Sequence, residues 1–323
     1  MASLYGTTVV TATGKELDEL FQAVLERLRQ RTRSPRATYR LQLGRDLRLR
    51  DAAALCAYLE ALGISDLYLS PIFEALPGSK HGYDVVDHQR LNPELGSEDD
   101  LEALEQAAAR HGMGLILDVV PNHMGIGASN RLWLDVLENG PSAAAARYFD
   151  IDWRPVKEEL QWKVLLPILG DQYGRVLERG ELRLAFVGGS FEVRYHDHLF
   201  PVDPRTYPLV LSYRLAELAG LLGAEDERLQ DYQSVVTALA ALPDRRENDP
   251  DRAAERQREK EVQKRRLARL CERVAEVARF VAENVVLFNG RPGEPQSFDL
   301  LDDLLDAQGY RLAHWRVAGE EIN

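Results

Sequence analysis

The spacing of apolar residues in the first part of the chain alternates between the period of a strand and that of a helix. Residues 37–43, 64–69 and 114–117 predict strands, and the apolar run of the third predicts a strand buried on both faces. Residues 51–62 and 97–111 carry apolar residues at helical spacing between these strands. This β-α-β-α-β order, with short returns, predicts parallel strands joined by right-handed crossovers.

Local signals mark the ends of these elements. Gly63 closes the first of the two helices, and Ser97 followed three residues later by Asp100 resembles a capping box at the start of the second. Between the second strand and the second helix we expect a long loop from Ser70 to Gly96.

The remainder of the chain predicts helices and one hairpin. The predicted helices are residues 14–33, 209–222, 229–242, 251–286 and 298–307, and the predicted strands are residues 182–186, 191–195 and 310–317. The amphipathic helix 14–33 is expected to dock on the body of the protein. Residues 243–250 are the best linker candidate, and the highly charged first half of the helix 251–286 suits a solvated surface.

These elements predict an α/β fold: the N-terminal part of a (β/α)8 TIM barrel with a large, mostly helical inserted subdomain. We assign residues 1–33 to an N-terminal extension, 34–124 to three βα units, 125–300 to the inserted subdomain, and 301–323 to a return segment toward the barrel. A closed barrel needs eight strands and usually about 250 residues before insertions. Only three strand–helix units are clear, so we expect the barrel to be incomplete in this sequence.

Composition narrows the classes of partner. The formal net charge is −12, which argues against a nucleic-acid partner because such a partner requires a basic face. No apolar run is long enough to span a membrane, and the first residues lack the pattern of a secretory signal, so we expect no membrane partner and a cytoplasmic location. Cys56 and Cys271 lie far apart in apolar helical patterns and are interpreted as reduced residues.

Chemistry-bearing residues follow two of the predicted parallel strands. Asp118, Asn122 and His123 come after the third strand, and His81-Gly82-Tyr83-Asp84 lies in the loop after the second. The carboxyl ends of parallel barrel strands share one edge, where active sites form. The same residue types are also ordinary in loops, so spacing alone leaves open a turn-capping Asp118 and a surface His123.

The segment His196-Asp197-His198 is a separate candidate. In a strand, its two histidines would share a face, as metal ligands do. No further ligands gather nearby in the sequence, and a polar strand face is the alternative interpretation.

Several segments resemble the α-amylase family of glycoside hydrolases and transferases. DVVPNH at 118–123 resembles the family's first sequence signature, and HGYDVVD at 81–87 fits its second-strand loop. More narrowly, further segments resemble the branch of this family that forms trehalose-ended glucans. These segments are SPRATYRLQL (34–43), residues 58–96, YFDIDW (148–153), KVLLPILG (163–170) and YRLAHWRVAGEEIN (310–323).

The resemblance implies an intramolecular transglycosylation, classed as an isomerase reaction, on a maltooligosaccharide. The reducing-end α-1,4 bond becomes an α,α-1,1 bond through a retaining mechanism with an aspartate nucleophile and a glutamic acid. In that mechanism Tyr83 would stack on the sugar whose bond is cut, and His123 would hydrogen-bond its primary hydroxyl. Asp118 would hold the pocket's arginine, or another supporting partner, in place.

The resemblance also bears on the remaining candidates. His81 and Asp84 would belong to the same substrate pocket. Asn122 aligns with a structural calcium ligand of some family members, but the trehalose-forming branch does not generally depend on calcium. We therefore expect no metal and no cofactor.

None of these residues is the nucleophile or the acid, which in the family come later in the chain. We expect both beyond Asn323, in a missing C-terminal part of the same enzyme, and expect this chain alone to be inactive. Two alternatives remain open at this point. One is an α-amylase-type glucan hydrolase, and the other is a non-catalytic, glucan-binding remnant.

Overall fold

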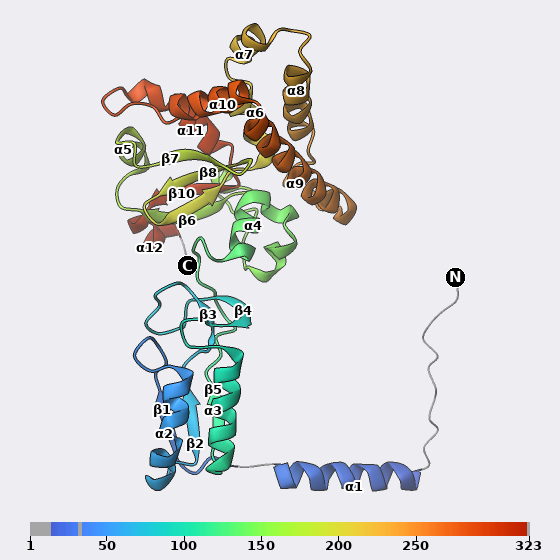
Figure 1. Ribbon diagram of the computed structural model, residues 1–323, viewed down its shortest axis with the longest axis vertical. Coiled ribbons are helices and arrows are strands. Elements are labelled where there is room, and N and C mark those ends of the chain that lie inside the picture. The colour runs from blue at the N-terminus through green and yellow to red at the C-terminus, as the bar shows by residue number, and fades with distance from the viewer. Residues whose placement is uncertain (1–13, 32–33, 322–323) are drawn as a thin grey trace. The chain divides into compact units, whose positions relative to one another are not determined.

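The computed structural model describes residues 14–31 and 34–321, which contain two compact units. The first unit is formed by residues up to His123 and the second by residues from Met124 onward. Both contain helices and strands, so the chain as described is mixed α and β (Figure 1).

The first described helix, α1 (Gly14–Arg31), confirms the predicted amphipathic helix, whose last two predicted residues lie outside the described ranges. Its apolar side chains, however, are exposed. They are Leu17, Leu20, Phe21, Val24 and Leu28. The expected burial of this face against the body of the protein is therefore not observed.

The first unit is built on a parallel sheet of order β1-β2-β5. Its elements are β1 (Thr38–Leu41), α2 (Leu49–Ala61), β2 (Asp66–Leu69), β3 (Phe73–Ala75), β4 (Val85–Leu91), α3 (Glu98–Arg110) and β5 (Gly114–Leu117). The strands pair in parallel, with Arg40 opposite Tyr68 and Tyr68 opposite Ile116. The predicted β-α-β-α-β order is confirmed, as is the capping box of Ser97 and Asp100 at the start of α3.

The core of this unit lies on one face of the sheet. Leu67 and Leu69 of β2 pack with Leu49 and Leu59 of α2 and with Leu104 of α3. The prediction that the third strand is buried on both faces is wrong. β5 is an edge strand of this sheet, and its last residue, Leu117, is 43% exposed.

The expected long loop after β2 contains two further strands. β3 and β4 pair in antiparallel fashion with shifts in register, and these shifts break the regular alternation that would mark a hairpin in the sequence. The segment between them carries the HGYD motif and contains Gly82 at φ +75°. A Cβ at Gly82 would lie 3.0 Å from the carbonyl oxygen of Pro71, so only glycine fits this turn comfortably.

The second unit combines strands with a larger set of helices. Its strands are β6 (Val164–Leu169), β7 (Arg183–Val187), β8 (Ser190–Tyr195), β9 (His198–Pro201) and β10 (Tyr310–His314). Its α-helices are α4 (Arg131–Asn139), α5 (Tyr173–Glu178), α6 (Tyr207–Leu211), α7 (Leu215–Leu222), α8 (Glu227–Ala240), α9 (Pro250–Arg273), α10 (Ala275–Phe288), α11 (Asp299–Asp306) and α12 (Ala318–Glu321). Short 3-10 helices are η1 (Gly140–Ser142), η2 (Ala144–Tyr148), η3 (Glu158–Leu160), η4 (Pro204–Thr206), η5 (Pro295–Phe298) and η6 (Trp315–Val317).

The strands of this unit form two sheets. β7, β8 and β9 form an antiparallel sheet, which confirms the predicted hairpin at residues 182–195. β10 pairs in parallel with β6, so two segments far apart in the sequence lie side by side (Figure 1). One continuous apolar core joins these strands to the helices, with Phe191, Tyr207 and Phe298 among its most buried members.

Two predicted helices are broken in the structure. Residues 209–222 form the end of α6 and α7, which are separated at Arg214, a residue with φ +57°. The long predicted helix 251–286 divides into α9 and α10 at Val274, whose backbone is extended. The side chains on both sides of each break keep the helical spacing of apolar residues, so periodicity alone could not reveal the breaks.

The charged first half of α9 is solvated on one side, where Asp251, Arg252 and Arg258 are exposed, but its other side is buried, which its composition does not predict. Arg256 and Lys260 are 1% and 2% exposed, and Lys264 is also buried. Arg256 donates to Asp203 Oδ1 at 2.6 Å, and both lysines form ion pairs with the carboxylate of Glu138. Burial of these side chains is tolerated because each is paired and hydrogen-bonded.

The predicted linker 243–250 is also wrong, because these residues are fixed within the second unit. Arg245 donates to the carbonyl oxygens of Ala307 and Gln308 at 2.8 and 3.2 Å. The carbonyl of Pro243 accepts a hydrogen bond from Arg256. A turn-rich, charged composition is typical of a linker, but here the charged side chain of Arg245 holds the segment against the rest of the unit.

Candidate functional site

The polar cluster at the end of the parallel sheet is centred on one carboxylate oxygen, Oδ2 of Asp118. The hydroxyl of Tyr83 donates to it at 2.6 Å, Arg40 Nη1 at 3.0 Å and the hydroxyl of Tyr68 at 3.2 Å. Arg40 Nη2 also donates to the Tyr83 hydroxyl at 2.9 Å. The guanidinium of Arg40 lies over the ring of Tyr68, 4.6 Å from its centroid.

The strand register explains why these residues meet. Arg40 and Tyr68 are paired across β1 and β2, and Asp118 follows the pairing partner of Tyr68 by two residues. Side chains two residues apart point to the same face of a sheet. The face that carries this cluster is therefore opposite to the one on which Leu67 and Leu69 pack against the helices.

The cluster keeps Asp118 ionised. The hydrogen bond from Tyr83, supported by Arg40 and Tyr68, lowers the pKa of the Asp118 carboxyl below its ordinary value. The same carboxylate raises the pKa of the Tyr83 phenol, which stays protonated and able to donate. None of the described residues donates a hydrogen bond to the second oxygen of Asp118, Oδ1, so that oxygen can accept from a ligand.

We expect the Asp118 carboxyl to titrate below the ordinary aspartate value of about 3.9. Its pKa is lower in the folded state, so its contribution to stability is present above about pH 4 and is lost as the pH falls through the folded pKa. Carbon-detected NMR of the aspartate carboxyls can follow this titration. In Tyr83→Phe the midpoint should rise toward the ordinary value. A wild-type midpoint at or above 3.9 would contradict the hydrogen-bonded geometry.

The structure does not bring His81 and Asp84 into this cluster. Asp84 accepts a hydrogen bond from the hydroxyl of Ser79, and its Oδ1 lies 3.8 Å from His81 Nδ1. His81 Nδ1 also accepts from the backbone N–H of Tyr83 at 3.0 Å. These two residues therefore shape the turn that presents Tyr83, and their predicted contact with substrate stays a prediction.

His123 and Asn122 lie after β5 and are both exposed. His123 Nε2 is 3.0 Å from the backbone carbonyl of Tyr83, so this nitrogen carries the proton and Nδ1 remains for another partner. The side chain of Asn122 makes no hydrogen bond within the described ranges. The structure thus connects His123 to the Tyr83–Asp118 cluster through the backbone, but not Asn122.

Arg40 and Tyr68 are the two members of the cluster that the sequence analysis did not select. Each lies on a predicted strand, and each is a polar or amphipathic residue facing away from the helices. Position on the face opposite to the buried leucines was the available signal. This signal could not identify Asp118 as the shared partner, because the sequence of one strand does not determine its register with the neighbouring strand.

The interpretation of His196 and His198 as ligands on one strand face is wrong. His196 has φ +48° and lies in the turn between β8 and β9, where Tyr195 pairs with His198. A turn of this kind removes the alternation on which that face depended. Among residues 14–31 and 34–321, no group of three or more His, Cys, Asp or Glu side chains is arranged to hold a metal ion. Cys56 and Cys271 are both free thiols, and the described helices include none long and apolar enough to cross a membrane.

The class of protein that the fold and the cluster indicate is identified by comparison with known protein families. Residues 54–163, which include β2 to β5 and the segments carrying Tyr83 and Asp118, match the alpha-amylase catalytic domain family. In TIM-barrel enzymes the active site forms at the carboxyl ends of the parallel strands, and the polar cluster lies at that edge of β1, β2 and β5.

Within that class, two relatives have matching names. A protein of Mycobacterium tuberculosis (strain H37Rv), described as a putative maltooligosyl trehalose synthase, is 44% identical over 169 residues, which are 48% of this chain and 22% of that protein. The structure of maltooligosyltrehalose synthase from Arthrobacter ramosus is 42% identical and covers 53% of this chain and 22% of its own, with a TM-score of 0.47. The resemblance inferred from the sequence is confirmed.

A third comparison covers more of the chain. The DSM5389 glycosyltrehalose synthase is 25% identical, with a TM-score of 0.52 over 86% of this chain and 27% of that one. Its coverage exceeds the length of either compact unit, so the likeness includes residues of both. The chain spans about a fifth to a quarter of the length of these relatives.

Proposed function

We propose that this protein acts in the conversion of maltooligosaccharides to maltooligosyl trehalose. The reducing-end α-1,4 bond breaks, the freed glucose stays bound, and its anomeric hydroxyl attacks to form an α,α-1,1 bond. The observation that carries the proposal is the Arg40–Tyr83–Asp118 cluster at the carboxyl end of β1, β2 and β5. The named relatives at 42–44% identity support the trehalose-forming outcome over hydrolysis.

In this proposal the cluster binds and orients the sugar. Tyr83 presents a ring whose hydroxyl is fixed by Asp118, and Oδ1 of Asp118 accepts a hydrogen bond from a sugar hydroxyl. His123 contributes Nδ1 as a further polar contact. Because Arg40 neutralises the carboxylate, the cluster suits an uncharged ligand.

We further propose that the nucleophile and the acid are supplied from outside the described residues, beyond Asn323. A retaining glycosidase mechanism requires two carboxyl groups about 5 Å apart, flanking the bond that is cut. Asp118 is already committed to three donors on one oxygen. Residues 1–323 alone are therefore proposed to bind maltopentaose without converting it.

Incubation of the natural gene product with maltopentaose tests the function. We expect reducing ends to disappear while little glucose is released, because the freed glucose is recaptured before water reaches the site. Reducing-end assay and chromatography of the products measure both quantities. Dominant release of glucose or maltose would instead establish an amylase-type hydrolase.

The same preparation distinguishes the non-catalytic alternative. A gene product that binds maltopentaose but leaves it unchanged would establish a glucan-binding protein. Turnover by residues 1–323 alone would show that the reacting carboxylates lie within this chain and would overturn their proposed origin.

A further inference from the structure

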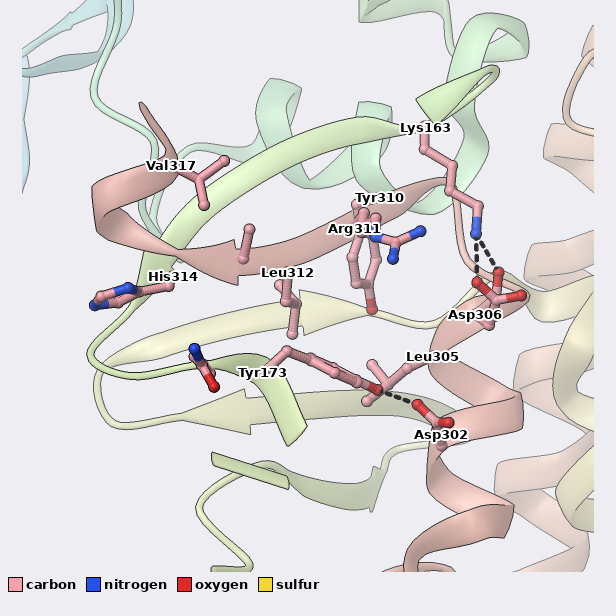
Figure 2. Close-up of a pocket in the computed structure, with 12 residues that line it drawn as sticks. Lys163, Tyr173, Asp302, Leu305, Asp306, Tyr310, Arg311, Leu312, His314 and Val317 are labelled. Atoms are coloured by element: carbon pink, nitrogen blue, oxygen red, sulfur yellow. Dashed lines mark hydrogen bonds and ion pairs between the residues drawn. The ribbon is translucent and has the colours of Figure 1, made fainter. Parts of the chain in front are cut away.

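The second unit contains a pocket of about 480 Å³ beside β10 (Figure 2). Its wall is formed by residues of β10, α5, α11 and η6 and by Lys163, which directly precedes β6. The polar side chains that line it include Lys163, Tyr173, Asp302, Asp306, Arg311 and His314. This volume lies within the range of small-molecule binding sites. The function proposed above does not involve the residues of this pocket.

Two pairs of side chains organise one side of the pocket. The hydroxyl of Tyr173 donates to Asp302 Oδ1 at 2.6 Å, and Lys163 Nζ donates to Asp306 Oδ1 at 2.9 Å (Figure 2). Lys163 also donates to the Asp306 backbone carbonyl, which fixes the ammonium group at the end of α11. Burial, with the nearby carboxylate of Asp302, raises the pKa of Tyr173, so its hydroxyl remains a donor at any physiological pH.

Several polar atoms in the pocket remain available. Within the part of the chain that the structure describes, Oδ2 of Asp302 accepts no hydrogen bond and the guanidinium of Arg311 donates none. The amide of Gln172 is likewise without a side-chain hydrogen bond there. The pocket is therefore lined by acceptor and donor groups that are not hydrogen-bonded to one another.

The charges in the pocket cancel. Lys163 and Arg311 carry two positive charges, and Asp302 and Asp306 carry two negative ones. An uncharged ligand rich in hydroxyls can use the open atoms of Asp302 and Arg311 together and leaves the net charge of the pocket at zero. Apolar surface is supplied by the ring of Tyr173 and by Leu305, so flat apolar faces of a ligand can also be covered.

We propose that this pocket binds a segment of maltooligosaccharide chain. The ligand class rests on the proposed function, while the location rests on the geometry of the second unit. Asp302 and Arg311 hydrogen-bond sugar hydroxyls, and Tyr173 provides the face against which a glucose ring packs. Trp315, which is 54% exposed and whose ring makes an edge contact with His314, adds a second aromatic face next to the pocket.

Isothermal titration calorimetry of residues 1–323 with maltopentaose tests the proposal. We expect Asp302→Asn and Arg311→Met each to weaken binding about tenfold, the loss of one charge-assisted hydrogen bond. Asp303→Asn is the matched control, because Asp303 is an exposed neighbour on α11 that does not line the pocket. It should bind like the wild type. Cellopentaose, with β-linked glucose, serves as the control ligand and should bind more weakly.

The titrations are repeated in a Tyr83→Ala background, which removes the ring of the site in the first unit. If Asp302→Asn and Arg311→Met weaken binding in either background while thermal melting is unchanged, the pocket proposal is supported. This holds even if the gene product proves to be a hydrolase. If both variants bind like Asp303→Asn, or if only Tyr83→Ala affects binding, the pocket proposal is overturned and the proposed function is untouched. Absence of maltopentaose binding by the wild-type chain overturns the pocket proposal as well. The proposed function is tested separately, by the activity of the gene product.

Discussion

Replacing Glu138 with glutamine is expected to lower the free energy of unfolding of the second unit by about 3 kcal/mol or more, because it removes the buried carboxylate that two buried lysines share. Glu138 on α4 pairs with Lys260 and Lys264 on α9, and the three side chains are 10%, 3% and 10% exposed. A neutral amide can still accept hydrogen bonds, but it cannot offset two ammonium groups in a desolvated site. Urea denaturation followed by circular dichroism measures the loss.

Glu261→Gln is the matched control. Glu261 lies near the same two lysines but is 43% exposed, so solvent screens its charge and its loss should cost less than about 1 kcal/mol. Combining Glu138→Gln with Lys260→Met and Lys264→Met should restore much of the lost stability, since no buried charge then lacks a partner. Wild-type stability of the single Glu138 variant would contradict the buried ion pairs.

The same cluster gives the second unit a defined response to acid. Burial alone would raise the pKa of Glu138, but the charges of Lys264 and Lys260 outweigh it and lower the pKa below its ordinary value. The stabilisation is therefore present above the unfolded-state pKa of about 4.3 and is lost as the pH falls through the folded value. Glu138→Gln should remove this part of the acid sensitivity.

The parallel sheet of the first unit could be predicted because each of its signals is local. Each signal lies within a short segment of the sequence. The strands are marked by short apolar runs, the two helices by apolar residues at helical spacing, and the start of α3 by the Ser97 cap. Their order then determines the strand direction, because a helix-length connection returns the chain to the same edge. That is why Tyr83 and Asp118 could be expected to share one site before their contact was seen.

The residues whose burial or contacts could not be predicted have interaction partners far away in the sequence. Arg256, Lys260 and Lys264 repeat at the helical spacing of an inward face, continuing to the buried Leu267, yet their charges indicate solvent. Their burial depends on Asp203 and on Glu138, which is more than 120 residues away from Lys264. Arg40 is a similar case, since it contacts Asp118 across 78 residues. No local pattern reports such a pairing.

Asp118→Asn is expected to lower kcat/KM of the gene product with maltopentaose about 100-fold, the order of loss that misplaced binding groups cause. The carboxylate oxygen that accepts from Tyr83, Arg40 and Tyr68 carries the charge that keeps the three side chains together. An asparagine would present either a neutral oxygen or a competing N–H to these donors. Steady-state kinetics with the disappearance of reducing ends as the readout measures the effect.

Two comparisons separate positioning from folding. Asp99→Asn, on the exposed first turn of α3, removes a carboxylate from the same unit and should leave kcat/KM unchanged. Tyr83→Phe combined with Asp118→Asn should lose little more than Asp118→Asn alone, because the phenol hydroxyl acts only through the carboxylate that fixes it. Fully additive losses would mean that Tyr83 and Asp118 contact the sugar independently. The 2.6 Å hydrogen bond between them would then be incidental to catalysis, and Oδ1 of Asp118 would be the atom to test next.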